Sequence, residues 1–358
     1  MITEQYLKSV FKGKRVFLTG HTGFKGAWLL QILNWLGAHI KGYSLEPEKS
    51  NDLYNQISGD RLCYTSVIAD ICDKQKLTTE LVRFEPDFVF HLAAQALVKR
   101  GYEMPSYTFM VNVQGTAHVL DAIKSLKTPC IGVMITTDKV YDNPERGIPF
   151  NEDDKLGGYD PYSASKAAAE IVIDSYRRSF FNPAFYLQHH KSIAAARAGN
   201  VIGGGDFSDN RIIPDIVRSI SFDEPVGLRN PASIRPWQHV LEPLGAYLLL
   251  AAKLTEDPLR YATAYNFGPN PEDMLTVEEL TKIFFNAYGY GSHKNLALEN
   301  MPHEAKLLLL DSTKALVELG WKSKMNAETA IELTSKWYAD KHNNAHNKCM
   351  EQIKAYFL

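Results

Sequence analysis

A glycine-rich turn close to the N-terminus limits the folds open to this chain more than any other feature. The apolar segment 14–18 (KRVFL) runs directly into residues 19–26 (TGHTGFKG), where glycine recurs at every third position. An apolar helical pattern follows over 24–36. In this order the first glycine permits a tight turn, the second lets a pyrophosphate approach the backbone, and the third packs the helix closely on the strand. The stretch predicts a dinucleotide-binding turn whose helix N-terminus attracts phosphate, with a plain structural turn as the alternative.

Apolar strands and helical patterns alternate through the N-terminal half of the chain. Such alternation indicates an α/β fold with a doubly wound parallel sheet, the Rossmann fold. Further buried strands are predicted over 39–44, 64–69, 87–92, 130–137 and 192–201, and long helices over 105–126 and 161–181.

The pattern loosens after the three glycines at 203–205, where mixed loops and shorter helices are predicted. An apolar segment over 239–254 is suited to return to the sheet. We therefore predict a dinucleotide-binding domain over 1–196, rejoined by 238–266. The remaining ranges, 197–237 and 267–358, form a smaller, mostly C-terminal lobe that binds substrate.

Composition excludes several classes of protein. With 358 residues and 45% hydrophobic side chains the chain can bury a sizeable core. The net charge is -2, and acidic and basic residues are interspersed, so the sequence indicates no basic surface that would bind nucleic acid or an anionic membrane. No apolar stretch reaches membrane-spanning length, so we expect a cytoplasmic protein. Four scattered cysteines predict neither a disulfide framework nor a metal site.

A second cluster of chemically capable side chains lies between residues 135 and 166. Asp138 and Lys139 follow the apolar strand 130–137, at the carboxyl edge where open α/β sheets bind ligands. A mutual ion pair is the alternative reading of these two residues.

The same cluster continues on the next predicted helix. Asp160 and Pro161 are typical of a helix start, and Tyr162 and Lys166 are then four residues apart on one face. A lysine beside a tyrosine favours the phenolate and lowers the tyrosine pKa from about 10, which would make Tyr162 a general base. A surface tyrosine and a solvated lysine are the alternative.

The ends of the other strands suggest where a dinucleotide would lie. Ser44 occupies the place of the usual ribose-binding acid, and Glu46 follows two residues later. The absence of a basic residue there disfavours the 2′-phosphate of NADP. Asp70 and Ile71 form a polar and apolar pair suited to adenine, although Asp70 could equally cap the following helix. His91, within an apolar run, is predicted to be a core histidine.

Basic and aromatic residues gather in the predicted second lobe. Arg211, Arg229 and Arg235 occur there together with Trp237 and His239. Such side chains suit a diphosphate and an aromatic base, and solvated surface arginines are the alternative.

Several motifs together resemble a known superfamily. T-G-x-x-G-x-x-G, H-L-A-A-Q, N-V-x-G-T (112–116) and Y-x-x-x-K resemble the extended short-chain dehydrogenase/reductases over essentially the whole chain. Five longer stretches resemble the CDP-glucose 4,6-dehydratase family: GHTGFKG (20–26), TTDK (136–139), LGGYDPYSASK (156–166), AGNVIGGGD (198–206) and RPWQHVLEP (235–243). The chain departs from that pattern at Lys99, Gly101, Val140 and Tyr159, where the family has Arg, Ser, Cys and His.

The resemblance implies a tightly held NAD, a substrate that is CDP-glucose or a similar nucleotide sugar, and a role in making deoxysugars for lipopolysaccharide O-antigen. It implies catalysis by Thr137, Asp138, Lys139, Tyr162 and Lys166. Besides Tyr162 and Lys166, the implied cofactor contacts are Gly20, His21, Thr22, Gly23, Phe24, Gly26, Asp70, Ile71, Leu92, Ala93, Ala94 and Thr136. The implied substrate contacts are Gln95, Lys99, Asn200, Arg211, Arg235 and His239.

The implied reaction is oxidation of the sugar at C4, loss of water across C5 and C6, and return of the hydride to C6. Tyr162 would take the C4 hydroxyl proton, Lys139 the C5 proton, and Asp138 would protonate the leaving hydroxyl. A sugar 4-epimerase or simple dehydrogenase, and a non-catalytic dinucleotide sensor, are the alternatives. The resemblance also implies a homodimer or tetramer built on helices 105–126 and 161–181.

Overall fold

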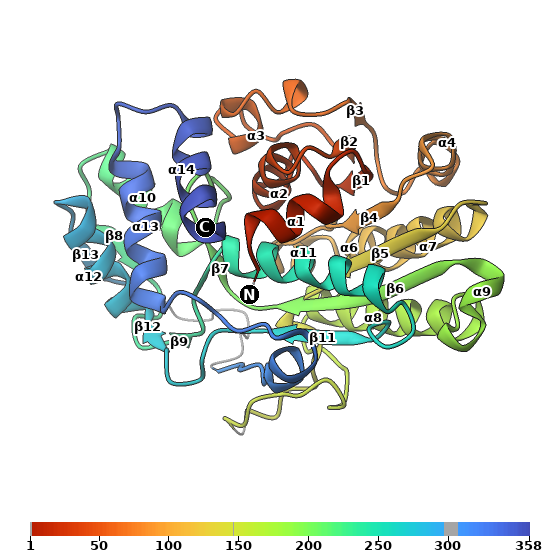
Figure 1. Cartoon of the computed structure of the whole chain (residues 1–358). Coiled ribbons are helices and arrows are strands. Elements are labelled where there is room, and N and C mark those ends of the chain that lie inside the picture. The colour runs from red at the N-terminus through yellow and green to blue at the C-terminus, as the bar shows by residue number, and fades with distance from the viewer. Residues whose placement is uncertain (1, 146, 297–306) are drawn as a thin grey trace.

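A seven-stranded parallel sheet forms the centre of the molecule (Figure 1). The computed structural model describes residues 2–145, 147–296 and 307–358. The strand order is β11-β6-β5-β4-β1-β2-β3, which confirms the predicted doubly wound sheet. The order reverses between β1 and β4, and ligands bind at such switch points. The strands span Arg15–Thr19 (β1), His39–Ser44 (β2), Thr65–Ile68 (β3), Phe88–His91 (β4), Cys130–Ile135 (β5), Lys191–Ala198 (β6) and Ala264–Phe267 (β11).

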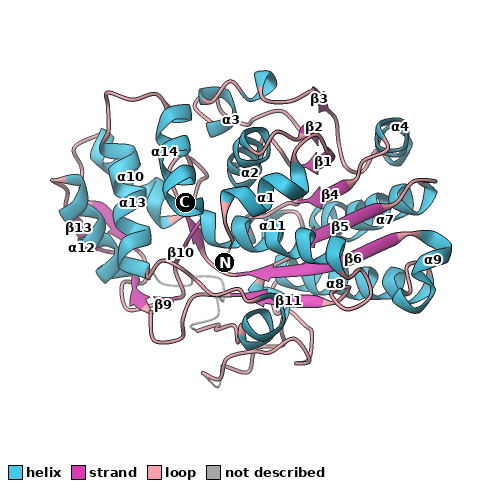
Figure 2. Ribbon diagram, viewed as in Figure 1, coloured by secondary structure: helices cyan, strands magenta, loops and turns pink. Residues whose placement is uncertain are grey.

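Helices cover both faces of the sheet, as the ribbon in Figure 2 shows. One face packs against α2 (Phe24–Trp35) and α11 (Leu241–Glu256), and the other packs against α4 (Lys74–Phe84), α7 (Gly115–Ser125) and α8 (Pro161–Ser179). The segment expected to return to the sheet is thus α11, which packs on β5 and β6 and leads into β11.

The predicted helix over 105–126 is interrupted. It consists of α6 (Pro105–Phe109), a π-helical turn η2 (Met110–Gln114) and α7. The turn contains the buried Asn112, whose amide donates to the Gln95 carbonyl (3.0 Å) and to the Ser165 hydroxyl (2.8 Å). This side chain therefore connects the end of β4 to α8.

The second lobe lies beyond the carboxyl edge of the sheet, at the left of Figure 1. Residues 297–306 of the range predicted for this lobe lie outside the described residues. The elements of the ranges predicted for it are β7 (Val201–Ile202), α10 (Ile212–Ser221), β8 (Val226–Leu228), β9 (Ile234–Arg235), β12 (Leu275–Thr276), α12 (Val277–Tyr288), β13 (His293–Asn295), α13 (Ala327–Ala339) and α14 (Ala345–Phe357). β10 (Gln238–His239), from the range predicted to rejoin the sheet, pairs with β7, whereas η5 (Ala315–Leu319) packs on α11 and β11.

The last helix returns to the first domain. α14 packs against both α13 and α2, and the rings of Trp35 and Phe357 lie 6.0 Å apart. Shorter elements complete the described chain: α1 (Glu4–Phe11), α3 (Leu53–Gln56), η1 (Gly59–Arg61), α5 (Val98–Glu103), η3 (Asp138–Val140), η4 (Pro183–Phe185) and α9 (Tyr186–His189). Within the described ranges, no helix is long and apolar enough to span a membrane.

The third glycine of the turn is required by packing. A Cβ on Gly26 would lie 1.9 Å from the Gly20 carbonyl oxygen, whereas a Cβ on Gly23 would lie 3.5 Å from the same atom. Backbone cannot move aside as a flexible side chain can. Gly26→Ala should therefore lower the free energy of unfolding by about 3 kcal/mol, measured by urea denaturation.

Gly23→Ala is the matched control. It adds the same methyl group at ordinary contact distance and should leave the urea midpoint nearly unchanged. If Gly26→Ala unfolds at the same urea concentration as Gly23→Ala, the close approach of α2 to the turn is wrong.

Candidate active site

The glycine turn brings three strand ends together. Gly20 adopts φ +75°, and a Cβ there would lie 2.8 Å from the Ala93 backbone nitrogen. The end of β4 therefore lies directly against the turn. Thr22 hydrogen-bonds Ser44 at 2.8 Å, so the residue in the usual acidic place is held by the turn itself.

The turn has the features that a dinucleotide diphosphate needs. Gly23 caps α2 without a side-chain hydrogen bond, so no side chain of the cap competes for the amides of the first turn. Beneath the turn, the His21 ring fills the space left by Gly42, where a Cβ would lie 2.4 Å from the ring. Burial lowers the pKa of His21 to about 4, so this histidine is neutral and structural. Phe24, the first residue of α2, is half-buried against the core. These features fit a bound dinucleotide.

Two segments bring the predicted catalytic side chains together. Thr137 caps the short turn η3 and donates a hydrogen bond to the Asp138 carboxylate (2.8 Å). On α8, the Asp160 carboxylate accepts from the Ser163 amide (3.0 Å), which fixes the helix start. Tyr162 is thereby buried on the face of α8 towards η3, close enough to Thr137 for this side chain to lower the pKa of the phenol in part.

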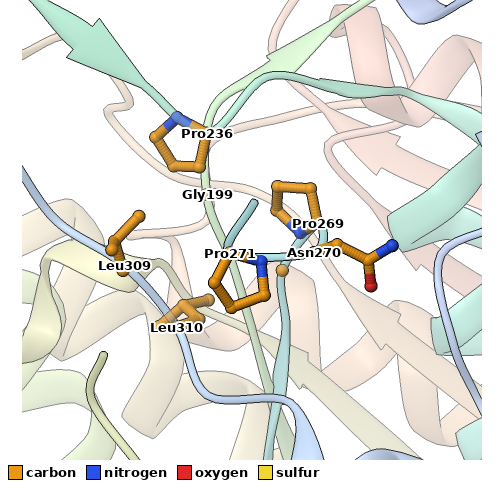
Figure 3. Close-up of a pocket in the computed structure, with 8 residues that line it drawn as sticks. Gly199, Pro236, Pro269, Asn270, Pro271, Leu309 and Leu310 are labelled. Carbon is orange, nitrogen blue, oxygen red and sulfur yellow. The ribbon is translucent and has the colours of Figure 1, made fainter. Parts of the chain in front are cut away.

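Asp138 is buried at the meeting point of two strand ends. A Cβ on Gly199 would lie 3.1 Å from its carboxylate, and Gly199 therefore permits the close approach of the two loops. Gly199 and Pro236 also line a cavity of about 10 Å³ whose prolines and leucines converge in Figure 3. This cavity has space for about one water molecule, and a hexose does not fit in it.

Lys139 follows Asp138 in η3 and is half-buried. Among the described residues no ion pair joins the two side chains, so the alternative reading of a mutual pair finds no support. Lys139 is thus not tied to Asp138.

The expected pKa of Tyr162 differs from what the structure gives. Burial raises the pKa of Tyr162 to about 12, and burial lowers the pKa of Lys166 to about 8. The Lys166 ammonium donates to the Ile135 carbonyl (3.1 Å) instead of lying against the phenol. The desolvation cost thus exceeds the benefit expected from the helical spacing.

A further cation occupies the centre of this cluster. The Lys25 ammonium donates to the Tyr247 hydroxyl (3.0 Å). Burial, followed by the nearby charges of Lys166 and Arg211, lowers the pKa of Lys25 to about 7. We did not predict Lys25 or Tyr247 as site residues, although Lys25 lies inside the glycine motif. Together these cations make the site attractive to anionic ligands.

The predicted substrate contacts of the second lobe are only partly brought to the cluster. Arg211 pairs with Asp206 (2.9 Å) and lies close enough to Tyr162 for their charges to interact. Arg235 is buried in β9 and donates to the Ile234 carbonyl (2.9 Å). The Asn200 carbonyl accepts from the Gln238 amide (3.0 Å), and its side chain is half-buried.

Two predicted substrate residues have partners inside the protein. Gln95 uses both ends of its amide internally, because it donates to the Thr108 hydroxyl (2.9 Å) and accepts from the Leu97 amide (2.7 Å). His239 is fully buried with its ring 5.9 Å from that of Trp28, and burial lowers its pKa to about 3. Both side chains have contacts inside the protein that could serve packing, and their roles in substrate binding stay predictions. Lys99, also predicted, is exposed on α5.

Other predicted cofactor residues have structural partners. Ile71 is buried against Gly115, where a Cβ would lie 2.9 Å from its side chain, so its face is not open to adenine. Asp70 accepts from the Cys72 amide (2.8 Å), and Asp73 rather than Asp70 caps α4. His91 is a core histidine, as predicted, bonded to Thr19 and Thr116. The half-buried Leu92, Ala93 and Ala94 lie at the end of β4, as expected.

Comparisons with known proteins agree with this geometry. Residues 17–334 match the family model described as GDP-mannose 4,6 dehydratase. A CDP-glucose 4,6-dehydratase of Salmonella typhimurium is 45% identical over 331 residues, which are 92% of each chain. A probable dTDP-glucose 4,6-dehydratase of Sinorhizobium fredii is 26% identical and covers 91% of this chain and 93% of its own.

Solved structures show the same fold. The dTDP-glucose 4,6-dehydratase DesIV from Streptomyces venezuelae, with NAD and TYD bound, has a TM-score of 0.76 at 24% identity and covers 91% of this chain and 97% of its own. The UDP-glucose 4-epimerase from Brucella ovis, in complex with NAD, has a TM-score of 0.76 at 20% identity, with 91% and 99% covered. From the match over residues 17–334 and the 45% identity to a relative of the same length, it follows that the chain belongs to the family of the GDP-mannose 4,6 dehydratase model.

Proposed function

We propose that the protein is an NAD-dependent CDP-glucose 4,6-dehydratase, a hydro-lyase that forms CDP-4-dehydro-6-deoxy-D-glucose. The observation that carries the proposal is the buried meeting of Thr137 and Asp138, at the end of β5, with Tyr162 on α8. The 45% identity to the Salmonella typhimurium enzyme supports the CDP-glucose substrate.

Bound at the glycine turn, NAD would supply the acceptor for the C4 hydride and later its donor to C6. Tyr162 takes the C4 hydroxyl proton, and the Thr137 hydroxyl, which lies near Tyr162, binds the same sugar oxygen. The resulting ketone acidifies the C5 proton.

Elimination needs a base at C5 and an acid at C6. We assign the C5 base to Lys139, which follows Asp138 in η3 and is half-buried. Asp138 gives a proton to the C6 hydroxyl, which leaves as water, and after the hydride has returned to C6 the protonated Lys139 gives its proton back to C5. The position of Asp138 between the Thr137 hydroxyl and the cavity beside Gly199 suits a group that must act away from bulk water.

The alternative is a nucleotide-sugar 4-epimerase on the same scaffold, which the fold also allows. An epimerase uses the tyrosine and a hydroxyl residue, so Asp138 and Lys139 would have no work in it. Incubation with CDP-, dTDP-, GDP- and UDP-hexoses decides between them. A 4-keto-6-deoxy product, identified by mass, supports the dehydratase, and a 4-epimer formed without loss of water would overturn it.

We also propose that the protein assembles as a homodimer through α6, η2, α7 and α8, and that two such dimers can form a tetramer. These elements carry the exposed apolar side chains of Phe109, Met110 and Ile171. Exposed apolar surface of this kind is costly unless a second copy covers it.

The assembly can be tested at Ile171, which is 61% exposed on α8. Ile171→Glu should convert the dimer to a monomer in light scattering at micromolar concentration, because two carboxylates would be buried across a two-fold axis. Leu187→Glu is the control, since Leu187 is 83% exposed on α9, outside these elements. A wild-type monomer, or equal effects of both variants, would refute the interface.

A further inference from the structure

A buried ion pair lies beneath the catalytic groups, among residues that no sequence motif had singled out. Glu170 is on α8, one turn beyond Lys166, and Arg197 is on β6; each side chain is 4% exposed. The guanidinium donates to both carboxylate oxygens, each at 3.0 Å. Two charges this far from water persist only as a well-bonded pair. The Glu170 carboxylate of this pair lies one helical turn beyond Lys166, and its charge is offset by the Arg197 guanidinium.

Glu170 contacts the start of the catalytic loop. The Thr136 hydroxyl donates to the Glu170 carboxylate (2.5 Å), and the Thr136 amide donates to the Ala196 carbonyl (2.9 Å). Thr136 is thus fixed by its side chain and by its backbone. The hydroxyl of the next residue, Thr137, is left to serve Asp138 and Tyr162.

Arg197 contacts the end of the same loop. Its Nη1 donates to the Tyr141 hydroxyl (2.7 Å) and to the Glu152 carbonyl (3.2 Å). The Tyr141 hydroxyl donates in turn to Asn266 on β11 (2.7 Å). Both ends of the segment 136–141, which carries Asp138 and Lys139, are therefore bonded to one ion pair.

The charges around Lys166 come from several elements. Glu170 lies on its own helix, Lys25 lies on α2 and His91 on β4, and the Arg197 guanidinium on β6 is bonded to Glu170. Burial lowers the pKa of His91 to about 3, so it contributes no charge at neutral pH. Burial also lowers the pKa of Lys166 to about 8, and the charge of Glu170 opposes that shift.

We propose that Glu170, fixed by Arg197, is a positioning residue that sets the geometry of the catalytic loop through Thr136 and acts with its carboxylate on Lys166, one turn before it on α8. This inference rests on the proposed function, because Tyr162 needs the charge of Lys166 to act as a base on the sugar. It adds a second role, since the same carboxylate orients Thr136.

Glu170→Gln removes the charge and nearly preserves the shape. The Lys166 ammonium should then lose its proton about one pH unit lower. The alkaline limb of the pH profile of kcat with CDP-glucose should shift to lower pH by the same amount. Because the protonated fraction of Lys166 at pH 7 would then halve, we expect kcat at neutral pH to fall about twofold, and more at pH 8, with little change in KM. Glu170→Asp, which keeps the charge, should restore the alkaline limb.

Thr136→Val isolates the other role. It removes the hydroxyl from Glu170 without changing any charge, so kcat should fall while the alkaline limb stays in place. Urea unfolding of each variant separates lost stability from lost positioning. If Glu170→Gln does not fold, Thr136→Val still decides, because an unchanged kcat would overturn the proposal.

A measurement without substrate keeps the inference separate from the proposed function. Competitive labelling with acetic anhydride across a pH series, read by mass spectrometry, reports the ionisation of Lys166 directly. If wild type converts no nucleotide sugar, the proposed function fails, yet the labelling shift still tests the role of the Glu170 charge. An identical Lys166 titration in wild type and Glu170→Gln would refute that role.

Discussion

Alanine in place of Lys139 is expected to stop the reaction after the sugar has been oxidised. Thr137, Tyr162 and Lys166 remain in this variant, so the C4 hydroxyl can still lose its proton and hydride. Without the Lys139 amine the C5 proton stays, and water is not eliminated. Reduced nicotinamide should accumulate on the enzyme while formation of the 4-keto-6-deoxy product falls by about 10² to 10⁴-fold.

Single-turnover absorbance and mass spectrometry measure both quantities, and exchange of the C5 proton with deuterated water should be lost as well. Lys155→Ala is a suitable control, because Lys155 is an exposed lysine that pairs with Asp142 (2.8 Å) in the following loop. Turnover of Lys139→Ala near the wild-type rate would show that another group is the base.

Phenylalanine in place of Tyr162 is expected to block an earlier step. The aromatic ring remains and keeps α8 packed, but no group takes the C4 hydroxyl proton. Turnover should fall by about 10² to 10⁴-fold, as for Lys139→Ala, yet no reduced nicotinamide should appear. The two variants therefore distinguish the two proton transfers by a single spectroscopic signal.

The pH profile gives a second check on Tyr162. Burial raises the pKa of this phenol to about 12 and lowers that of Lys166 to about 8. Formation of the Tyr162 phenolate near neutral pH therefore requires a positive charge close to the phenol. The fall of wild-type activity towards acid pH should reflect protonation of Tyr162. The residual activity of Tyr162→Phe should not show this fall. Tyr176→Phe, which only loses a bond to Asp121 (2.8 Å) at the far end of α8, should turn over normally. Reduced nicotinamide in Tyr162→Phe would contradict this assignment.

Sequence patterns predicted the sheet and the catalytic helix well, because both depend on local periodicity. Buried strands are continuous apolar runs, and the Asp160 and Pro161 pair starts α8 where expected. The segments over 130–137 and 161–181 therefore gave the correct positions of Thr137, Asp138, Tyr162 and Lys166. The π-turn η2 was not predicted, since its cause is the contact of Asn112 with Gln95 and Ser165.

Some predicted site residues have internal partners that are distant in the chain and could not be foreseen from the sequence. From the sequence, Gln95 and His239 both resemble ligand-binding residues. In the structure the Gln95 amide donates a hydrogen bond to Thr108, and the His239 ring lies against the ring of Trp28. Polar side chains at strand ends can serve packing or binding, and only tertiary contacts distinguish the two. The spacing of Glu170, four residues after Lys166, was a usable signal, but its meaning depends on Arg197 from another strand.

Neighbouring residues on α8 face in opposite directions: Glu170 is buried with the ion pair, whereas Ile171 is 61% exposed on the surface assigned to the dimer. A straight helix transmits displacement along its length, so movement of the subunit interface would shift Tyr162, Lys166 and Glu170 as one body. Binding of substrate to one subunit would then be coupled to the reaction in the other subunit, and the coupling free energy would measure the strength of this link. If the proposed dimer forms through α8, association and catalysis should therefore be linked, and specific activity should vary with protein concentration across the dissociation range.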